Sequence, residues 1–255
     1  MNIFDAAILG LVEGITEFLP ISSTGHLILT AKLLELPQSE FLKSFEIAIQ
    51  LGAICAVLLL YWRSFLELPV LKKIAAAFIP TALIGFALYS FIKEYLIGNE
   101  KVVLVALALG GIILIIFELL HKESATASES IAAISYGQAV AIGFFQAIAV
   151  IPGVSRSAAT IIGGLLSGLK RTTIVEFSFL LAVPTMAAAT GLDVLKSYSS
   201  FNSGDALLLL AGFVTAFLVA IVVIKFFLRF IKTHSFISFG VYRILIAALF
   251  WFAVL

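Results

Sequence analysis

The stretch that decides the fold is EGITEFLPISSTGH, residues 13–26. It interrupts an apolar region, about 3–34, that is too long for one membrane span and whose halves are too short for full spans. Pro20 ends a helix, and the hydroxyl of Ser22 suits the cap of a new one. We predict a helix that enters the membrane, turns at mid-depth and leaves on the same side; an ordinary kinked span is the alternative.

A second apolar region, about 137–168, has the same character. It is interrupted by VIPGVSRS, residues 150–157, which again combines proline, glycine and hydroxyl side chains. Broken backbone of this kind persists in a membrane only where it lines a cavity inside the protein. The two interruptions, called here the first break and the second break, therefore predict one internal site.

The composition indicates an integral membrane protein. Of the 255 residues, 62% are hydrophobic and 12% are charged, against about 45–50% apolar and about 25% charged in soluble domains. A net charge of +1 offers no basic field for nucleic acid, and the single Cys55 excludes an internal disulfide scaffold. Residues 1–5 carry no basic side chain, so we expect no cleavable signal peptide.

The predicted fold is an all-α polytopic membrane protein with one membrane domain, 1–255. Six stretches are long and apolar enough to span, roughly 45–62, 74–92, 102–120, 174–194, 206–228 and 237–255. The polar segment 122–130 separates two repeats, about 1–121 and 131–255, each with one re-entrant broken-helix hairpin and three transmembrane helices. Glu46 and Glu176 are 176 − 46 = 130 residues apart, and Pro20 and Pro152 are 152 − 20 = 132 apart. Three crossings invert the second copy, which predicts an inverted repeat.

Basic residues orient this arrangement. Five lysines fall on the side from which the first hairpin enters: Lys32, Lys43, Lys93, Lys101 and Lys196. Nine basic residues fall on the other side: Arg63, Lys72, Lys73, Lys122, Lys170, Arg171, Lys225, Arg229 and Lys232. The excess of positive charge marks the cytoplasmic side, so both termini and the site of the first break are expected on the outer face.

The two breaks carry side chains that are costly in a membrane. Glu13 and Glu17 are four residues apart and share a helix face, His26 follows the first turn, and Arg156 lies in the second break. Hydroxyl side chains accompany them: Ser22, Ser23, Thr24, Ser155, Ser157 and Thr160. Helix N-termini and a guanidinium fork favour phosphate oxygens, whereas paired carboxylates call for a bridging divalent cation. This pattern predicts a phosphate or diphosphate site whose ligand has a hydrocarbon tail.

Purely structural roles remain open for single residues. Ser23 and His26 are close enough for a nucleophile and its base, or for a phosphate contact and a proton donor. The glutamates could instead form a buried cluster with Arg156, and any one hydroxyl could simply cap a helix. Glu46 and Glu176 could line the cavity or lie at a surface. Gln50 and Gln146 are expected to bond backbone groups freed by the breaks.

Residues 13–26 resemble the first signature of the undecaprenyl-diphosphate phosphatase family, the bacitracin-resistance type. Pro152-Gly153-Val154-Ser155-Arg156-Ser157, followed by Thr160, resembles its second signature. The resemblance covers essentially the whole chain, with Ala158 standing where the family usually has glycine. It implies a bacterial inner (plasma) membrane enzyme that removes the terminal phosphate from undecaprenyl diphosphate and recycles the lipid carrier for cell-wall synthesis.

The resemblance also implies roles for individual residues. Catalytic roles fall to Glu17, Ser23, His26 and Arg156, and metal binding to Glu13 and Glu17 with a divalent cation, Mg²⁺ or Ca²⁺. Substrate binding falls to Glu13, Ser22, Thr24, Gly25, Gly153, Ser155, Ser157 and Thr160. The expected partners are a polyprenyl diphosphate substrate and membrane lipid, with no nucleic acid; a homodimer stays open.

Two rival functions remain to be distinguished. A phosphatidic-acid-phosphatase type needs Ser-Arg, five intervening residues and then a histidine, and after Ser155-Arg156 that position is Ile162. A transporter or flippase for a polyprenyl phosphate lipid also uses inverted repeats with broken helices. Transport alone needs no proton relay and no metal-bridged carboxylates, so the two glutamates and His26 favour catalysis.

Overall fold

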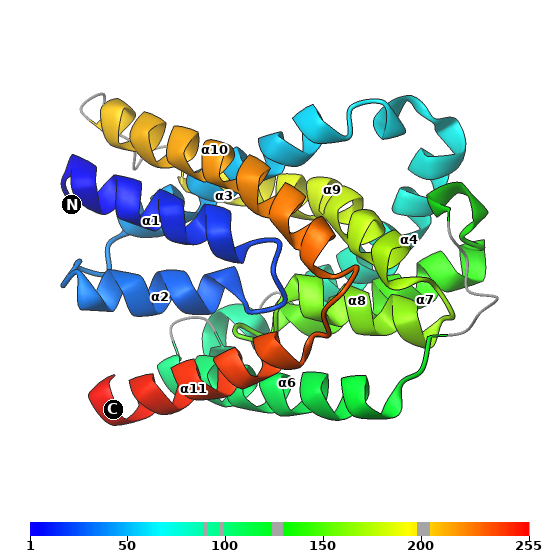
Figure 1. Ribbon diagram of the computed structural model, residues 1–255. Coiled ribbons are helices and arrows are strands. Elements are labelled where there is room, and N and C mark those ends of the chain that lie inside the picture. Colours follow the sequence, from blue (N-terminus) through cyan, green and yellow to red (C-terminus); the bar gives the residue numbers. More distant parts are fainter. Residues whose placement is uncertain (89–90, 97–98, 124–129, 198–204, 255) are drawn as a thin grey trace.

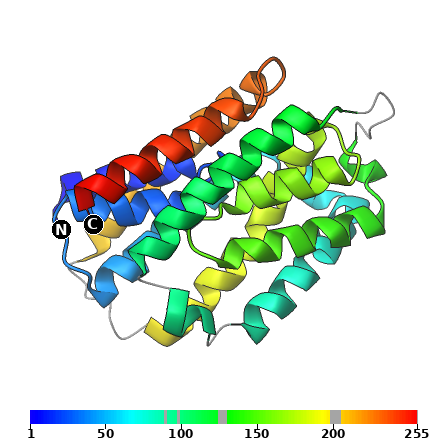
Figure 2. The ribbon, with the colours of Figure 1, turned by 90° about the horizontal axis from the view of Figure 1, so that it is seen from below.

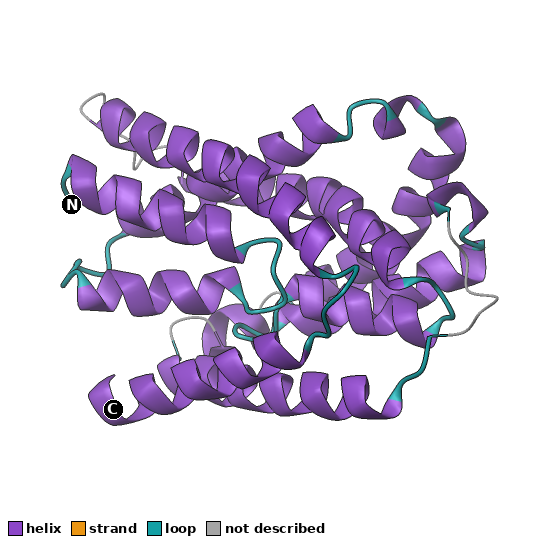
Figure 3. Cartoon of the chain, viewed as in Figure 1, coloured by secondary structure: helices purple, strands orange, loops and turns teal. Residues whose placement is uncertain are grey.

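The computed structural model describes residues 1–88, 91–96, 99–123, 130–197 and 205–254. Every regular element in these ranges is a helix, and no strand occurs there (Figure 3). The α-helices are α1 (Ile3–Thr16), α2 (Ser23–Leu33), α3 (Glu40–Leu60), α4 (Leu68–Ala87), α6 (Glu100–Leu120), α7 (Tyr136–Ala147), α8 (Arg156–Leu166), α9 (Arg171–Ser197), α10 (Ala206–Phe230) and α11 (Ile237–Val254). The polar linker predicted at 122–130 lies mostly outside the described residues.

The predicted all-helical membrane class is confirmed. Five helices, α3, α4, α6, α9 and α10, are long and apolar enough to cross a membrane. The sixth predicted span, 237–255, forms α11, which is apolar but shorter than these five over its described side chains. Apolar side chains such as Phe86, Leu120 and Phe252 remain exposed on the outside of the bundle, as a lipid solvent requires.

Both breaks fall where the sequence predicts them and have the same local geometry. The first separates α1 from α2, and the second, which includes the short turn Ile148–Val150, separates α7 from α8. Ser22 and Ser155 have φ angles of 71° and 78°, in the left-handed region that non-glycine residues rarely adopt. Each serine side chain accepts a hydrogen bond from the backbone N–H three residues later, on Gly25 and Ala158. The strained turn therefore ends directly in a capped helix.

The two broken hairpins enter the bundle from opposite ends. The helices α1 and α2 extend inward from the end that carries both termini, whereas α7 and α8 extend from the other end (Figures 1 and 2). The hairpins are flanked by long helices, since α1 packs on α10 and α7 packs on α4. The long helices α3 and α9 pack against each other, and α6 packs on α11. The breaks consequently meet inside the protein.

Arg243 of α11 holds the two breaks together. Its side chain is completely buried and donates hydrogen bonds to five backbone carbonyls. One carbonyl belongs to Pro20 in the first break, at 3.1 Å, and two belong to Gly153 and Val154 in the second, at 2.9 and 3.0 Å. The other two, on Ala106 and Leu107, belong to α6. One guanidinium thus supplies donors to three carbonyls of the non-helical breaks and joins both breaks to α6.

We predict that Arg243→Met destabilises the protein by about 3–5 kcal/mol, because it leaves several buried carbonyls without donors. Arg243→Lys should recover only part of this loss, since an ammonium cannot reach five carbonyls in one plane. Thermal unfolding in detergent measures the effect, with Arg229→Met, at an exposed position of α10, as the control. A melting temperature for Arg243→Met equal to that of the control would contradict this role.

Candidate active site

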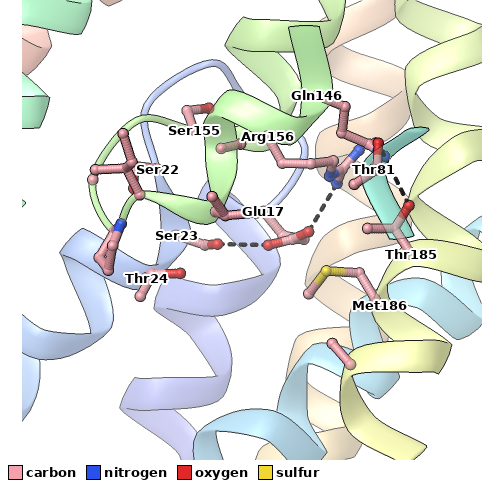
Figure 4. Close-up of a pocket in the computed structure, with 16 residues that line it drawn as sticks. Glu17, Ser22, Ser23, Thr24, Thr81, Gln146, Ser155, Arg156, Thr185 and Met186 are labelled. Carbon is pink, nitrogen blue, oxygen red and sulfur yellow. Dashed lines mark hydrogen bonds and ion pairs between the residues drawn. The ribbon is translucent and has the colours of Figure 1, made fainter. Parts of the chain in front are cut away.

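A buried cavity of about 240 Å³ lies where the two breaks meet (Figure 4). Its lining comes from both breaks and from α4, α7 and α9. The lining residues are Glu17, Ser22, Ser23, Thr24, Thr81, Gln146, Ala149, Val150, Ile151, Pro152, Gly153, Ser155, Arg156, Thr185, Met186 and Ala189. Because α2 and α8 both begin at this cavity, their free backbone N–H groups and positive dipole ends converge on it.

Glu17 accepts two hydrogen bonds, one from within the first break and one from the second. Its Oε2 accepts from the Ser23 hydroxyl at 2.5 Å, and its Oε1 accepts from Nη2 of Arg156 at 2.8 Å (Figure 4). Arg156 also donates from Nη1 to the backbone carbonyl of Ser178 on α9, at 2.8 Å. The side chains of Glu17 and Arg156 are only 4% and 11% exposed, so this ion pair is shielded from solvent. Three of the four predicted catalytic residues therefore form one connected group.

The fourth, His26, is directed elsewhere. Its Nδ1 lies 2.7 Å from the backbone carbonyl of Ser22, and its Nε2 lies 2.8 Å from the hydroxyl of Tyr242, whose ring stacks on the imidazole. Because a carbonyl can only accept, Nδ1 carries the proton and Nε2 accepts from Tyr242. His26 does not line the cavity, and the Ser23 hydroxyl faces Glu17 instead. A hydrogen bond between Ser23 and His26, one of the two predicted alternatives, is not formed in this structure, because the two side chains bond Glu17 and Tyr242 from other helices instead. The catalytic roles of both residues stay predictions.

The remaining predicted binding residues divide into two groups. Ser22, Thr24, Gly153 and Ser155 line the cavity, whereas Gly25, Ser157 and Thr160 do not. The Ser157 hydroxyl donates to the carbonyl of Phe18 at 2.9 Å, and so fastens the second break to the first. The Thr160 hydroxyl lies 2.6 Å from Oγ of Ser178 and near the carbonyl of Arg156. Ser157 and Thr160 therefore bond backbone and side-chain groups next to the cavity but do not line it.

Glu13 is completely buried, and neither of its carboxylate oxygens has a hydrogen-bond partner among the described residues. It lies within electrostatic range of Glu17, Glu46 and Arg156. Glu13 itself does not line the cavity, and neither do Glu46 and Glu176, the second of which interacts with Lys232. A carboxylate buried without donors is costly unless a cation compensates it. The donor set of Glu13 and Glu17 thus suits a hard divalent cation, although the described residues contain no cluster of three acidic, histidine or cysteine side chains.

Two features of the site are not predicted by the sequence. Arg243 lies within an apolar segment, and its five carbonyl partners are far apart in the sequence. Gln146 was expected to bond freed backbone, but its amide bonds the hydroxyls of Thr81 and Thr185. The available signal was that each threonine directly follows a proline inside a predicted span, at Pro80 and Pro184.

Comparison with known proteins identifies the family of this chain. The model of the family "Bacitracin resistance protein BacA" matches residues 6–249. The chain is 55% identical to an undecaprenyl-diphosphatase of Aquifex aeolicus, over 96% of each chain. It is 52% identical to an undecaprenyl-diphosphatase of Sulfurihydrogenibium sp., over 98% of this chain and 99% of that protein. With Wolinella succinogenes undecaprenyl-diphosphatase it shares 50% identity, over 99% of this chain and 98% of the other. The chain therefore belongs to the bacitracin resistance protein BacA family.

Proposed function

We propose that this protein is an integral membrane phosphatase that hydrolyses undecaprenyl diphosphate to undecaprenyl phosphate and phosphate, and so recycles the lipid carrier for cell-wall synthesis. The observation that carries this function is the Glu17–Ser23–Arg156 group in a buried cavity at two helix N-termini. The cavity lies inside an apolar bundle, which suits a substrate with a charged head and a long hydrocarbon tail. The undecaprenyl-diphosphatases that resemble this chain along its whole length support the same conclusion.

Each residue of the group has a chemical task in this proposal. Arg156 holds the terminal phosphate with the N–H groups at the starts of α2 and α8, and neutralises charge that develops on the leaving group. The Ser23 hydroxyl contacts the phosphate, and Glu17, which accepts a hydrogen bond from it, is placed to take a proton. His26, fixed by Tyr242 and by the carbonyl of Ser22, keeps the first turn of α2 directed at the cavity.

We infer that Glu13 and Glu17 would hold a divalent cation, Mg²⁺ or Ca²⁺. Support comes from the two carboxylate oxygens of Glu13, which are buried without hydrogen-bond partners. When bound, such a cation would offset the negative charge that both carboxylates direct at the substrate. Mg²⁺ typically uses one or two carboxylates and completes its shell with water and substrate phosphates, so a two-glutamate set is sufficient.

The purified protein in detergent should release inorganic phosphate from a polyprenyl diphosphate and leave the lipid monophosphate. A chelator should abolish this release, because the paired carboxylates would then repel the substrate. A phosphate assay combined with chromatography of the lipid product measures both effects. Undiminished activity after exhaustive metal removal would contradict the cation site. Lipid binding with no phosphate release would instead favour the transporter function.

Arg156→Lys should lower the turnover rate by about 10²–10³, because the ammonium keeps the charge but loses the planar fork. Glu17→Gln should also be impaired, but added metal should partly restore it if Glu17 binds the cation. A metal titration of both variants separates the two roles, with Arg63→Lys, at an exposed position, as the matched arginine control. Wild-type rates in Arg156→Lys would place the catalytic centre elsewhere.

We also propose that the two halves form an inverted repeat with re-entrant hairpins. Equivalent features recur 133 residues apart. The capping serines Ser22 and Ser155 have this separation (155 − 22 = 133), and so do Glu35 and Gly168, which have positive φ after the second helix of each hairpin. The third pair is Gly10 and Gly143, each at a close helix contact. A Cβ at Gly10 would collide with the backbone of α10, and one at Gly143 with the backbone of α4. This agreement of backbone detail supports a duplicated unit, and the opposite entry of the hairpins supports its inversion.

Cysteine labelling tests this topology. In a Cys55→Ala background, a single cysteine at Ser39 should react with an impermeant reagent from outside, because this position follows the first hairpin. A cysteine at the exposed Thr233, between α10 and α11, should react only from the cytoplasm. Labelling of both positions from the same face of the membrane would rule out the inverted repeat.

A further inference from the structure

A second polar cluster lies on the far side of Arg156 from Ser23, and the reaction proposed above does not use it. Gln146 of α7 donates from Nε2 to Oγ1 of Thr81 on α4, at 2.9 Å, and to Oγ1 of Thr185 on α9, at 3.0 Å. All three residues line the same cavity as Glu17 and Arg156 (Figure 4). Gln146 is only 1% exposed, although it lies in the middle of an apolar bundle.

The hydrogen bonds of the two threonines fix the orientation of the Gln146 amide. The Thr81 hydroxyl donates to the carbonyl of Gly143, and the Thr185 hydroxyl donates to the carbonyl of Leu181, both at 2.8 Å. Each threonine hydroxyl already donates its one proton to a carbonyl, so it can only accept a hydrogen bond from Gln146. The NH₂ group of Gln146 must face the threonines, and Oε1 must be its free end.

That free end has no partner among the described residues. Oε1 of Gln146 is buried without a hydrogen-bond donor, and Nε of Arg156, in the same cavity, is buried without an acceptor. Oε1 of Gln146 needs a hydrogen-bond donor. A phosphate oxygen offers no donor, and a cation would be repelled by Arg156 in the same cavity, whereas water can donate to Oε1. The cavity of about 240 Å³ has room for it beside a phosphate, since one water occupies about 30 Å³.

We propose that Gln146 binds the water molecule that the hydrolysis consumes, with the amide held in place by Thr81 and Thr185. This inference rests on the proposed function. The water oxygen forms the new bond to phosphorus as the bond from phosphorus to its leaving oxygen breaks, and that oxygen keeps the electron pair. One water proton stays hydrogen-bonded to Oε1 of Gln146, and the other passes to the carboxylate of Glu17. In this direct attack of water on the diphosphate, the Ser23 hydroxyl only contacts the phosphate and keeps its proton, so the carboxylate of Glu17 can accept the proton of the water.

A nucleophile-competition experiment tests the assignment. The full-length protein in detergent is given a polyprenyl diphosphate labelled in its terminal phosphate, in buffer containing methanol, and the ratio of methyl phosphate to inorganic phosphate is measured. Gln146→Met keeps the side-chain shape but removes the acceptor. It should raise this ratio by about fivefold, the effect of one ordinary hydrogen bond to the competing water. Its kcat should fall on the order of 10–10²-fold with little change in KM, because only the nucleophile is misplaced.

Phe144→Leu is the matched control, since Phe144 lies on the same helix as Gln146 but its side chain is 56% exposed on the surface of the protein. This variant should keep the wild-type ratio. If Gln146→Met does not fold, Gln146→Asn keeps the amide but withdraws its oxygen by one methylene, and should shift the ratio in the same direction. An unchanged ratio in either folded variant overturns the water assignment, even if kcat falls. A wild-type protein that releases no phosphate would instead overturn the proposed function itself.

Discussion

The structure depends on how the membrane-buried protein satisfies two stretches of non-helical backbone. A buried carbonyl that finds no donor costs free energy comparable to a lost hydrogen bond. Arg243 solves the problem with one fully buried guanidinium that donates to carbonyls of both breaks and of α6. Five donors in a rigid plane suit this task, and no other side chain offers them. The two breaks can then remain open toward a shared cavity.

The two breaks share a local backbone geometry but carry different side chains. Position 23 carries a serine, and position 156, which is 133 residues later, carries the arginine that shares Glu17 with it. Glu13 and Gln146 are also 133 residues apart, and both are buried with unpartnered side-chain oxygens. These are the residues that we propose to bind a divalent cation and the hydrolytic water. At equivalent positions, α1 thus carries a carboxylate and α7 an amide.

Much of the site could be predicted from the sequence because its residues lie next to the breaks. Glu17, Ser23 and Arg156 stand within a few residues of Pro20 or Pro152, and any folding of the breaks onto each other brings them together. The partner of each side chain could not be predicted in the same way. Ser23 and His26 are adjacent on the helix, yet their side chains diverge to Glu17 and Tyr242, because rotamers respond to packing from other helices.

The sequence alone determined the membrane class, five of the helical spans and the two breaks, and it predicts a phosphate site at the breaks, because each follows from composition or from a local motif. Only the tertiary structure decided that Arg243 closes the breaks, that Glu13 is left without a donor, and that Gln146 faces two threonines from α4 and α9. These are contacts between residues tens to hundreds of positions apart. No local pattern encodes them, since they exist only after several helices have packed around the same cavity.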